Sequence, residues 1–304
     1  MMKKEYNKLV LGGAQFGYNY VSKKSNLYKK KDEIIKIFSL GKKYGINKID
    51  TAQCYGRSEE NIGCFKKRLS KNIFLITKLD LTNYDKSQEN LENFIIKQVF
   101  LSLKKLRSKS IDILMIHNFY DLKKYGSNLT TILQKLKKLD LVKELGVSIY
   151  TPKELIYSAK FPIIKNIQIP FNIIDTRWNK KTIINLIKKK RIKIFARSIF
   201  LKGILINRKK SQFKDKKILK KIYMKLNEYS NKFNRTNRID VCLSFANSFN
   251  WIKYLVIGFN SKKEFGEILN NFNKPRFKKR EIKSISNDMS KMIRNKKILT
   301  PNLW

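Results

Sequence analysis

Four residues able to take part in proton transfer lie at or just after the ends of three successive strand-like segments. They are Asp50 and Tyr55 near the segment at 47–52, Lys78 at the end of 72–78, and His117 at the end of 110–117. A lysine ammonium that faces a tyrosine favours the phenolate and lowers the pKa of the phenol below its usual value of ~10. Such a tyrosine can donate a proton to a developing alkoxide near neutral pH, and a neighbouring imidazole can hydrogen-bond the same oxygen. Together, the four residue types indicate acid catalysis at an oxygen atom.

Each of these residues also has an ordinary structural explanation when it is taken alone. An aspartate at a strand end can cap a helix, a lysine there can be solvated, and a tyrosine ring can be half-buried. Their joint placement favours the chemical interpretation. A Ser-His-Asp hydrolase is a poor alternative, because the sequence GVSIY at 146–150 lacks the second glycine of the nucleophile motif. Asp112 also begins the strand that His117 ends, which separates the two residues by ~17 Å.

Eight short apolar segments alternate with segments of helical periodicity. The expected strands cover 8–13, 47–52, 72–78, 110–117, 143–148, 165–170, 191–198 and 253–258. Runs of this length fit strands buried on both faces, and their alternation with helices predicts an α/β fold, a single-domain (β/α)8 TIM barrel. In such barrels the reactive residues lie at the carboxyl ends of the strands. The glycine cluster GGAQFG lacks G-x-G-x-x-G spacing, which argues against a doubly wound sheet. We place the barrel at 1–273 and a basic helical extension at 274–304.

Four apolar stripes at helical spacing predict helices between the strands. They are formed by Ile34, Ile37, Phe38 and Tyr44; by Leu91, Phe94, Ile95, Val99, Leu103 and Leu106; by Leu129, Ile132, Leu133, Leu136 and Leu139; and by Ile218, Ile222, Leu226, Tyr229 and Phe233. Directly after a strand, Thr151-Pro152-Lys153-Glu154 predicts a capping box with proline at the first helical position. The connection at 199–252 is long enough for an extra helix.

The net charge is +45, from 68 Lys and Arg against 23 Asp and Glu in 304 residues. The excess is mostly lysine and is spread along the chain, so we interpret it as a compositional bias and do not expect nucleic-acid binding. The basic segment at 274–297 is the local exception. Its stripe of Ile282, Ile285, Met289, Met292 and Ile293 favours a helix packed on the barrel, with binding to an anionic surface as the alternative.

Cysteine and histidine usage limits the remaining classes of protein. Cys54, Cys64 and Cys242 form no C-x-x-C pair, so we expect free thiols in a reducing compartment. One histidine excludes His-rich metal sites, and we expect no metal. No segment resembles a secretory leader or a transmembrane helix, which predicts a cytoplasmic protein. The sequence indicates no oligomeric state.

Several motifs, taken in order, resemble the aldo-keto reductase superfamily. DTAQCYGRSEENIG at 50–63 resembles the family's signature, and ITK at 76–78 and DILMIHN at 112–118 resemble the two motifs that follow it. GVSIYTPKEL, IQIPFNIID, ARSIFLKGIL and YLVIGFNSKKEF resemble later strands, so the resemblance covers about residues 9–272. LGGAQFGYNY, IQIPFN and ARSIFLKG look closest to a bacterial branch often associated with the biosynthesis of surface polysaccharides and their sugars.

The resemblance implies hydride transfer from NADPH, with NADH not excluded, to a small aldehyde or ketone. It implies that Tyr55 is the general acid, that Lys78 and Asp50 tune it, and that His117 orients the carbonyl. Ser148 and Gln168 match the positions that hold the nicotinamide carboxamide, and Arg197, Ser198, Gly258, Lys262 and Lys263 are further candidates for cofactor binding. Gly17, Tyr18, Phe119 and Trp178 are candidates for the substrate pocket.

Some positions depart from the family pattern. Ile149 replaces a frequent Asn, and Arg197 stands where an aromatic ring commonly stacks on the nicotinamide; a planar guanidinium could stack instead or contact a phosphate. Lys262 and Lys263 could bind a 2′-phosphate, although Glu264 and Ile268 replace residues that usually help. The alternative to a carbonyl reductase, for which a sugar-derived carbonyl is a candidate substrate, is a cofactor-binding regulatory subunit with little turnover.

Overall fold

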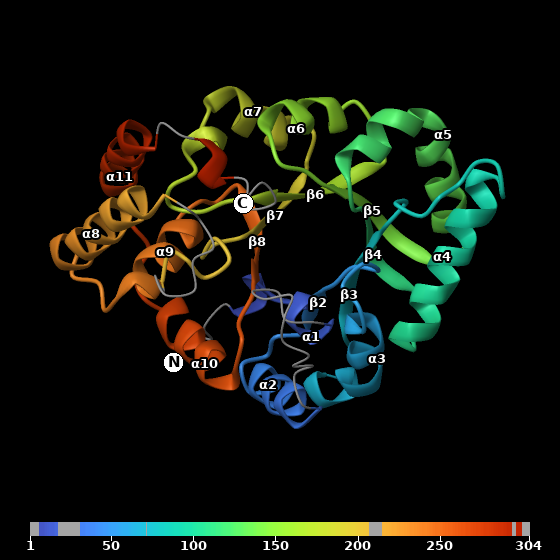
Figure 1. The fold of residues 1–304 in the computed structure, drawn as a ribbon, viewed down its shortest axis with the longest axis horizontal. Helices are drawn as coiled ribbons and strands as arrows, with labels where there is room; N and C mark the ends of the chain where they lie inside the picture. The colour runs from blue at the N-terminus through green and yellow to red at the C-terminus, as the bar shows by residue number, and fades with distance from the viewer. Residues whose placement is uncertain (1–5, 18–30, 71, 207–214, 294–295, 300–304) are drawn as a thin grey trace.

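The strands of the chain close into one parallel barrel (Figure 1). The computed structural model describes residues 6–17, 31–70, 72–206, 215–293 and 296–299. Within these ranges the barrel runs in chain order through β1 (Leu9–Gly12), β2 (Lys48–Asp50), β3 (Phe74–Leu79), β4 (Ile111–Ile116), β5 (Val142–Ser148), β6 (Ile164–Pro170), β7 (Lys193–Arg197) and β8 (Ile252–Ile257). The predicted (β/α)8 barrel is confirmed, and each predicted strand is present.

The barrel closes because β1 pairs with both β2 and β8, with Leu9 opposite Leu255 and Leu11 opposite Ile49. Successive side chains of a strand point to opposite faces, so Leu9 and Leu11 join the large apolar cluster that includes the helices. Val10 instead joins a smaller cluster of strand residues with Ile76, Ile113, Met115, Phe195 and Val256. With all strands parallel, their carboxyl ends meet at one rim.

Helices surround the barrel, and four of them lie where the apolar stripes predict helices (Figure 1). They are α1 (Ala14–Gly17), α2 (Lys31–Lys43), α3 (Ser58–Leu69), α4 (Leu91–Leu106), α5 (Phe119–Lys138), α6 (Pro152–Ser158), α7 (Lys181–Lys189), α8 (Lys216–Lys232), α9 (Arg238–Asn247), α10 (Lys262–Phe272) and α11 (Lys279–Met292). Short 3-10 helices are η1 (Tyr6–Lys8), η2 (Thr176–Trp178) and η4 (Lys296–Leu299). Both α8 and α9 lie between β7 and β8, so the extra helix expected there is present.

Two predictions concern the ends of helices: the capping box at the start of α6 is confirmed, and the placement of Leu139 at the end of α5 is wrong. The Thr151 hydroxyl accepts from the Glu154 N–H while the Glu154 carboxylate accepts from the Thr151 N–H, so the predicted capping box of α6 is present. Leu139 was expected on the buried stripe of α5, but its side chain is exposed. The reason is that α5 ends at Lys138 and Leu139 is its C-cap, where the apolar face no longer continues.

The stripe of the basic extension lies against the protein. Ile285 and Met289 of α11 are fully buried in the large core cluster. Figure 1 shows α11 beside α8, and the Tyr229 hydroxyl of α8 donates to Asp288 at 3.0 Å. The division of the chain at residue 273 stays a prediction.

The helices found in the described ranges are all too short or too polar to cross a membrane.

Candidate active site

A buried ion pair forms the centre of the rim. Lys78, in β3, and Asp50, at the end of β2, are both almost inaccessible, and Nζ lies 2.8 Å from Oδ2. Lys78 also donates to the Thr51 carbonyl at 2.8 Å, and Gln168 Nε2 of β6 donates to Asp50 Oδ1 at 2.8 Å. Burial lowers the pKa of Lys78, and attraction to Asp50 opposes that shift. The pair is therefore held in a single geometry by strands on opposite sides of the barrel.

Tyr55 and His117 lie next to this ion pair. The Lys78 Nζ is 5.1 Å from the centre of the Tyr55 ring, and the Tyr55 and His117 rings are 5.8 Å apart and nearly perpendicular. The pKa of His117 is lowered to about 4, mainly by burial and secondly by the charge of Lys78, so the imidazole is neutral near neutral pH. The structure thus brings together all four residues that the sequence analysis singled out. The arrangement suits proton donation from a phenol beside a neutral imidazole.

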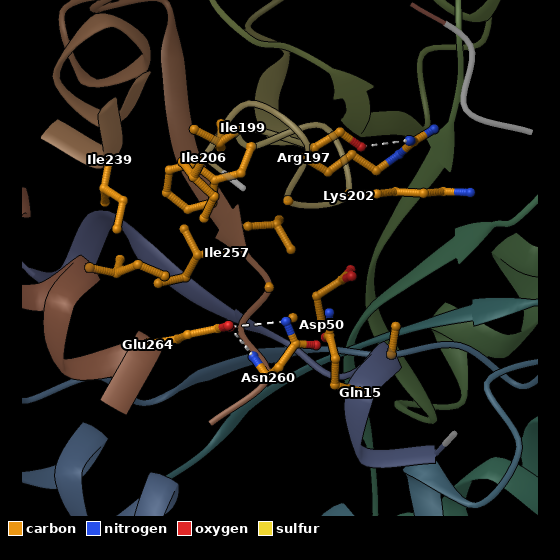
Figure 2. Close-up of a pocket in the computed structure, with 18 of the residues that line it drawn as sticks. Gln15, Asp50, Arg197, Ile199, Lys202, Ile206, Ile239, Ile257, Asn260 and Glu264 are labelled. Carbon is orange, nitrogen blue, oxygen red and sulfur yellow. Dashed lines mark hydrogen bonds between the residues drawn. The ribbon is translucent and has the colours of Figure 1, made fainter. Parts of the chain in front are cut away.

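A cavity of about 370 Å³ opens beside the ion pair and extends toward α9 and α10 (Figure 2). Asp50, Tyr55 and Gln168 line one part, and Glu264 and Glu267 of α10 line another. Predicted cofactor residues Arg197, Ser198 and Gly258 also line it, together with Gly12 and Gly13. Small residues let a ligand approach the backbone closely, and the guanidinium supplies positive charge for an anionic group.

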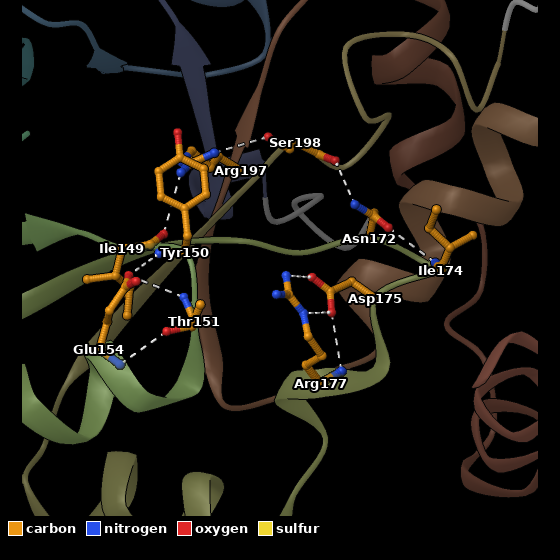
Figure 3. Close-up of polar contacts among 10 residues, drawn as sticks. All are labelled: Ile149, Tyr150, Thr151, Glu154, Asn172, Ile174, Asp175, Arg177, Arg197 and Ser198. Atoms are coloured by element: carbon orange, nitrogen blue, oxygen red, sulfur yellow. Dashed lines mark hydrogen bonds and ion pairs between the residues drawn. The ribbon is translucent and has the colours of Figure 1, made fainter. Parts of the chain in front are cut away.

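The segment after β7 forms one wall of the cavity in an unusual backbone conformation. Ser198, Leu201 and Lys202 have φ values of 60°, 48° and 54°, in the left-handed region that non-glycine residues seldom adopt. Arg197 stacks on Tyr150, with Cζ 4.5 Å from the ring centre, and donates to the Ile149 carbonyl at 3.4 Å (Figure 3). Strained backbone persists where surrounding structure holds it, often at ligand sites.

Other predicted site residues lie outside the described lining of this cavity. Ser148 is buried at the end of β5 opposite Gln168, and Lys262 and Lys263 are exposed at the start of α10. Phe119 packs against Tyr157 at the start of α5, with ring centres 5.4 Å apart.

The remaining residues predicted for the substrate pocket are Trp178, Gly17 and Tyr18. The Trp178 side chain is fully buried in the large core cluster and is not among the described residues that line the cavity. Gly17 ends α1 and packs directly against the backbone of Tyr55. Tyr18 lies outside the described residues.

Several lining residues were missed by the sequence analysis. They are Gln15, Lys202, Asn237, Arg238, Asn260 and Glu267. Asn237 is the N-cap of α9, so its polar type before an apolar helix was a usable signal. Glu264 accepts from the backbone and side-chain nitrogens of Asn260 at 2.6 and 2.9 Å, as Figure 2 shows. Only the folded chain reveals that Glu264 and Glu267 face the same cavity as Asp50.

Comparisons with known proteins agree with this arrangement. The model of the aldo/keto reductase family matches residues 8–287, which is most of the chain. A search of curated proteins finds no match.

Solved structures support the fold. The aldo-keto reductase AKR11C1 from Bacillus halodurans, in its holo form, superposes with a TM-score of 0.73 and is 18% identical, with 93% of this chain and 91% of that chain covered. PA4992 from Pseudomonas aeruginosa, whose assignment as an aldo-keto reductase is provisional, gives a TM-score of 0.64 at 17% identity over 87% and 89% of the two chains.

Proposed function

The chain belongs to the aldo/keto reductase family, and we propose that it reduces an aldehyde or ketone to an alcohol with NAD(P)H. The single observation that carries this proposal is the packing of Tyr55 and His117 around the Lys78–Asp50 ion pair beside the cavity. The bound nicotinamide supplies the hydride. The sequence motifs favour a sugar-derived carbonyl as the substrate class, and the three cysteines without a C-x-x-C pair favour the reducing cytoplasm as the setting.

The proposed mechanism assigns a role to each side chain. Tyr55 donates its phenolic proton to the carbonyl oxygen as negative charge develops there, and the neighbouring Lys78 ammonium stabilises the phenolate left behind. Asp50 holds the ammonium in place through its 2.8 Å contact. The neutral imidazole of His117 orients the substrate oxygen by a hydrogen bond.

The charged and polar groups that line the cavity suit those of a dinucleotide. Arg197, Lys202 and Arg238 bring positive charge to its walls, which suits a pyrophosphate, and Gln168 lines the cavity together with Tyr55. Our preference for NADPH rests on Lys262 and Lys263, whose side chains are exposed beside the cavity wall formed by α10.

The decisive experiment pairs turnover with cofactor binding in Tyr55→Phe. We expect the variant to lose about 10²–10⁴-fold in turnover, because the ring stays in place while the acidic proton is gone. Oxidation of NADPH and NADH with a panel of aldehydes and keto-sugars measures turnover, and quenching of protein fluorescence measures cofactor binding, which should be unchanged.

Two results would contradict the assignment. If Tyr55→Phe kept most of its activity, another group would be the acid. If the unmodified protein bound cofactor but reduced none of the panel, the regulatory alternative would replace the enzymatic one.

A further inference from the structure

A thiol, an imidazole and a carboxylate converge at the rim, and the proposed reaction uses only the imidazole. Cys54 follows β2, Asp80 follows β3 directly, and His117 follows β4 directly. One ligand atom from each lies within 4.8 Å of the others, and Cys54 Sγ is 3.2 Å from His117 Nδ1. We propose that these three residues bind a divalent transition-metal ion such as Zn²⁺, and that the ion inhibits the enzyme by taking its catalytic imidazole.

The donor set and its spacing match the chemistry of zinc. Thiolate, imidazole and carboxylate are its usual ligands in proteins, at ~2.3, ~2.0 and ~2.1 Å, so tetrahedral ligand atoms lie roughly 3.3–3.8 Å apart. Small movements of the side chains would bring the three atoms to these separations. The N–H of Thr82 donates to Asp80 Oδ1 at 3.0 Å and so helps to fix this carboxylate.

A second carboxylate, that of Asp121, lies close enough to Asp80 for the two charges to interact. Burial and the nearby charge of Asp80 raise the pKa of Asp121 to about 6, which reports two carboxylates close together. In a protein with 68 basic and 23 acidic residues, such a pair is unusual. The ammonium of Lys78, whose charge contributes to the lowered pKa of His117, is paired with Asp50 at 2.8 Å. A divalent ion would relieve the repulsion between the carboxylates.

A second cavity, of about 200 Å³, gives the ion a route and room for water ligands. Cys54 and Asp80 line it together with the polar side chains of Gln53, Asn83 and Gln98. None of the three metal-binding residues is among the described residues that line the larger cavity. The ion can therefore enter without competing for the space that we assign to the cofactor.

Binding has a defined proton balance and a defined effect on catalysis. As the Sγ–metal bond forms, the Cys54 thiol releases its proton to solvent, while neutral His117 donates its Nδ1 lone pair without losing a proton. Coordination replaces the direct contact between Cys54 and His117 with bonds to a shared cation, and the side-chain movements that this requires shift the ring relative to Tyr55. Displacing a catalytic group by ~1 Å can cost about 10²-fold in rate, so turnover should fall.

Cobalt absorbance tests ion binding without reference to activity. The chain is first treated with a chelator and then titrated with Co²⁺, whose bonds to thiolate sulfur give a near-ultraviolet charge-transfer band. We expect one equivalent to produce this band and Zn²⁺ to abolish it. Cys54→Ala should lack the band, and Asp80→Asn should bind at least about tenfold more weakly. Cys64→Ala removes another exposed thiol, on α3, and should behave like the unmodified chain.

The proposed site would be overturned if the unmodified chain gave no band, or if the band survived in Cys54→Ala.

The inhibitory role rests on the proposed reductase function and has its own test. We expect Zn²⁺ to lower turnover reversibly, and Asp80→Asn to require about tenfold more Zn²⁺. Full turnover with the ion bound would overturn the proposed inhibition. If the chain had no reductase activity, the proposed function would fail, and the cobalt titration would still decide whether the ion binds.

Discussion

At the scale of single residues, His117 is the group whose surroundings most change its behaviour. Its pKa of about 4 lies well below the ordinary value because the ring is buried and the charge of Lys78 lies nearby. An unfolded chain, with a histidine pKa of ~6.5, therefore binds more protons between these two values. The contribution of His117 to stability is present above pH ~6.5 and is lost as the pH falls toward 4.

We predict that the imidazole does not titrate between pH 5 and 8. Because the chain has one histidine, its Hε1 proton gives a single assignable NMR signal. The chemical shift should stay constant in this range and move only as the pH approaches 4. The urea-unfolded chain is the control and should titrate near ~6.5. A folded-state midpoint near that value would show that the ring is solvated and would remove the neutral imidazole from the mechanism.

The sequence allowed prediction of the catalytic residues but not of the contacts that hold them. Asp50, Lys78 and His117 were found because each stands at the end of an apolar run, and the barrel fold brings such ends together. The hydrogen bond between Gln168 and Asp50 joins residues 118 positions apart, and no local pattern encodes it. Cys54 and Asp80 were likewise recognised as partners of His117 only in the folded chain.

At the scale of elements, α1 and the segment carrying Tyr55 are packed backbone to backbone. A Cβ atom on Gly17 would lie 1.5 Å from the carbonyl oxygen of Tyr55, so only glycine fits. We predict that Gly17→Ala destabilises the protein by about 3 kcal/mol or more and reduces turnover, because either α1 or Tyr55 must move. Urea unfolding and the reductase assay measure the two effects.

Gly266→Ala is the matched control for this prediction. Gly266 lies within α10, and a Cβ atom there would meet nothing within 4 Å. Alanine has the higher helix propensity, so the control should be about 0.5–1 kcal/mol more stable than the unmodified chain. Equal stability of the two variants would show that α1 does not press against Tyr55.

Periodicity predicted the elements better than it predicted their ends and the directions of their side chains. In the sequence, Leu139 continues an apolar stripe, but α5 ends one residue earlier, at Lys138. Lys262 and Lys263 begin α10, but the residues of this helix that line the cavity are Glu264, Glu267 and Ile268. The direction of a side chain depends on how its helix is rotated against the barrel, which packing decides.

At the scale of the whole molecule, the net charge of +45 opposes folding by self-repulsion. We predict that added NaCl stabilises the protein, because salt screens charges more than about 10 Å apart at ~0.1 M. Urea unfolding at rising NaCl concentration is the measurement, since guanidinium chloride is itself a salt. A midpoint that fell with salt would mean that favourable ion pairs outweigh the repulsion.

The barrel itself was predictable because most residues of its strands are buried, so the strands appear in the sequence as short, largely apolar runs. Closure by pairing of β1 with β8, Leu9 opposite Leu255, has a further consequence for synthesis of the chain. A ribosome adding ~5–20 residues per second needs roughly 10–50 s between these two strands. Throughout that interval β1 lacks its β8 neighbour and offers an unpaired edge to other nascent chains. Until β8 is made, pairing of β1 with another nascent chain is therefore a route by which this protein can aggregate.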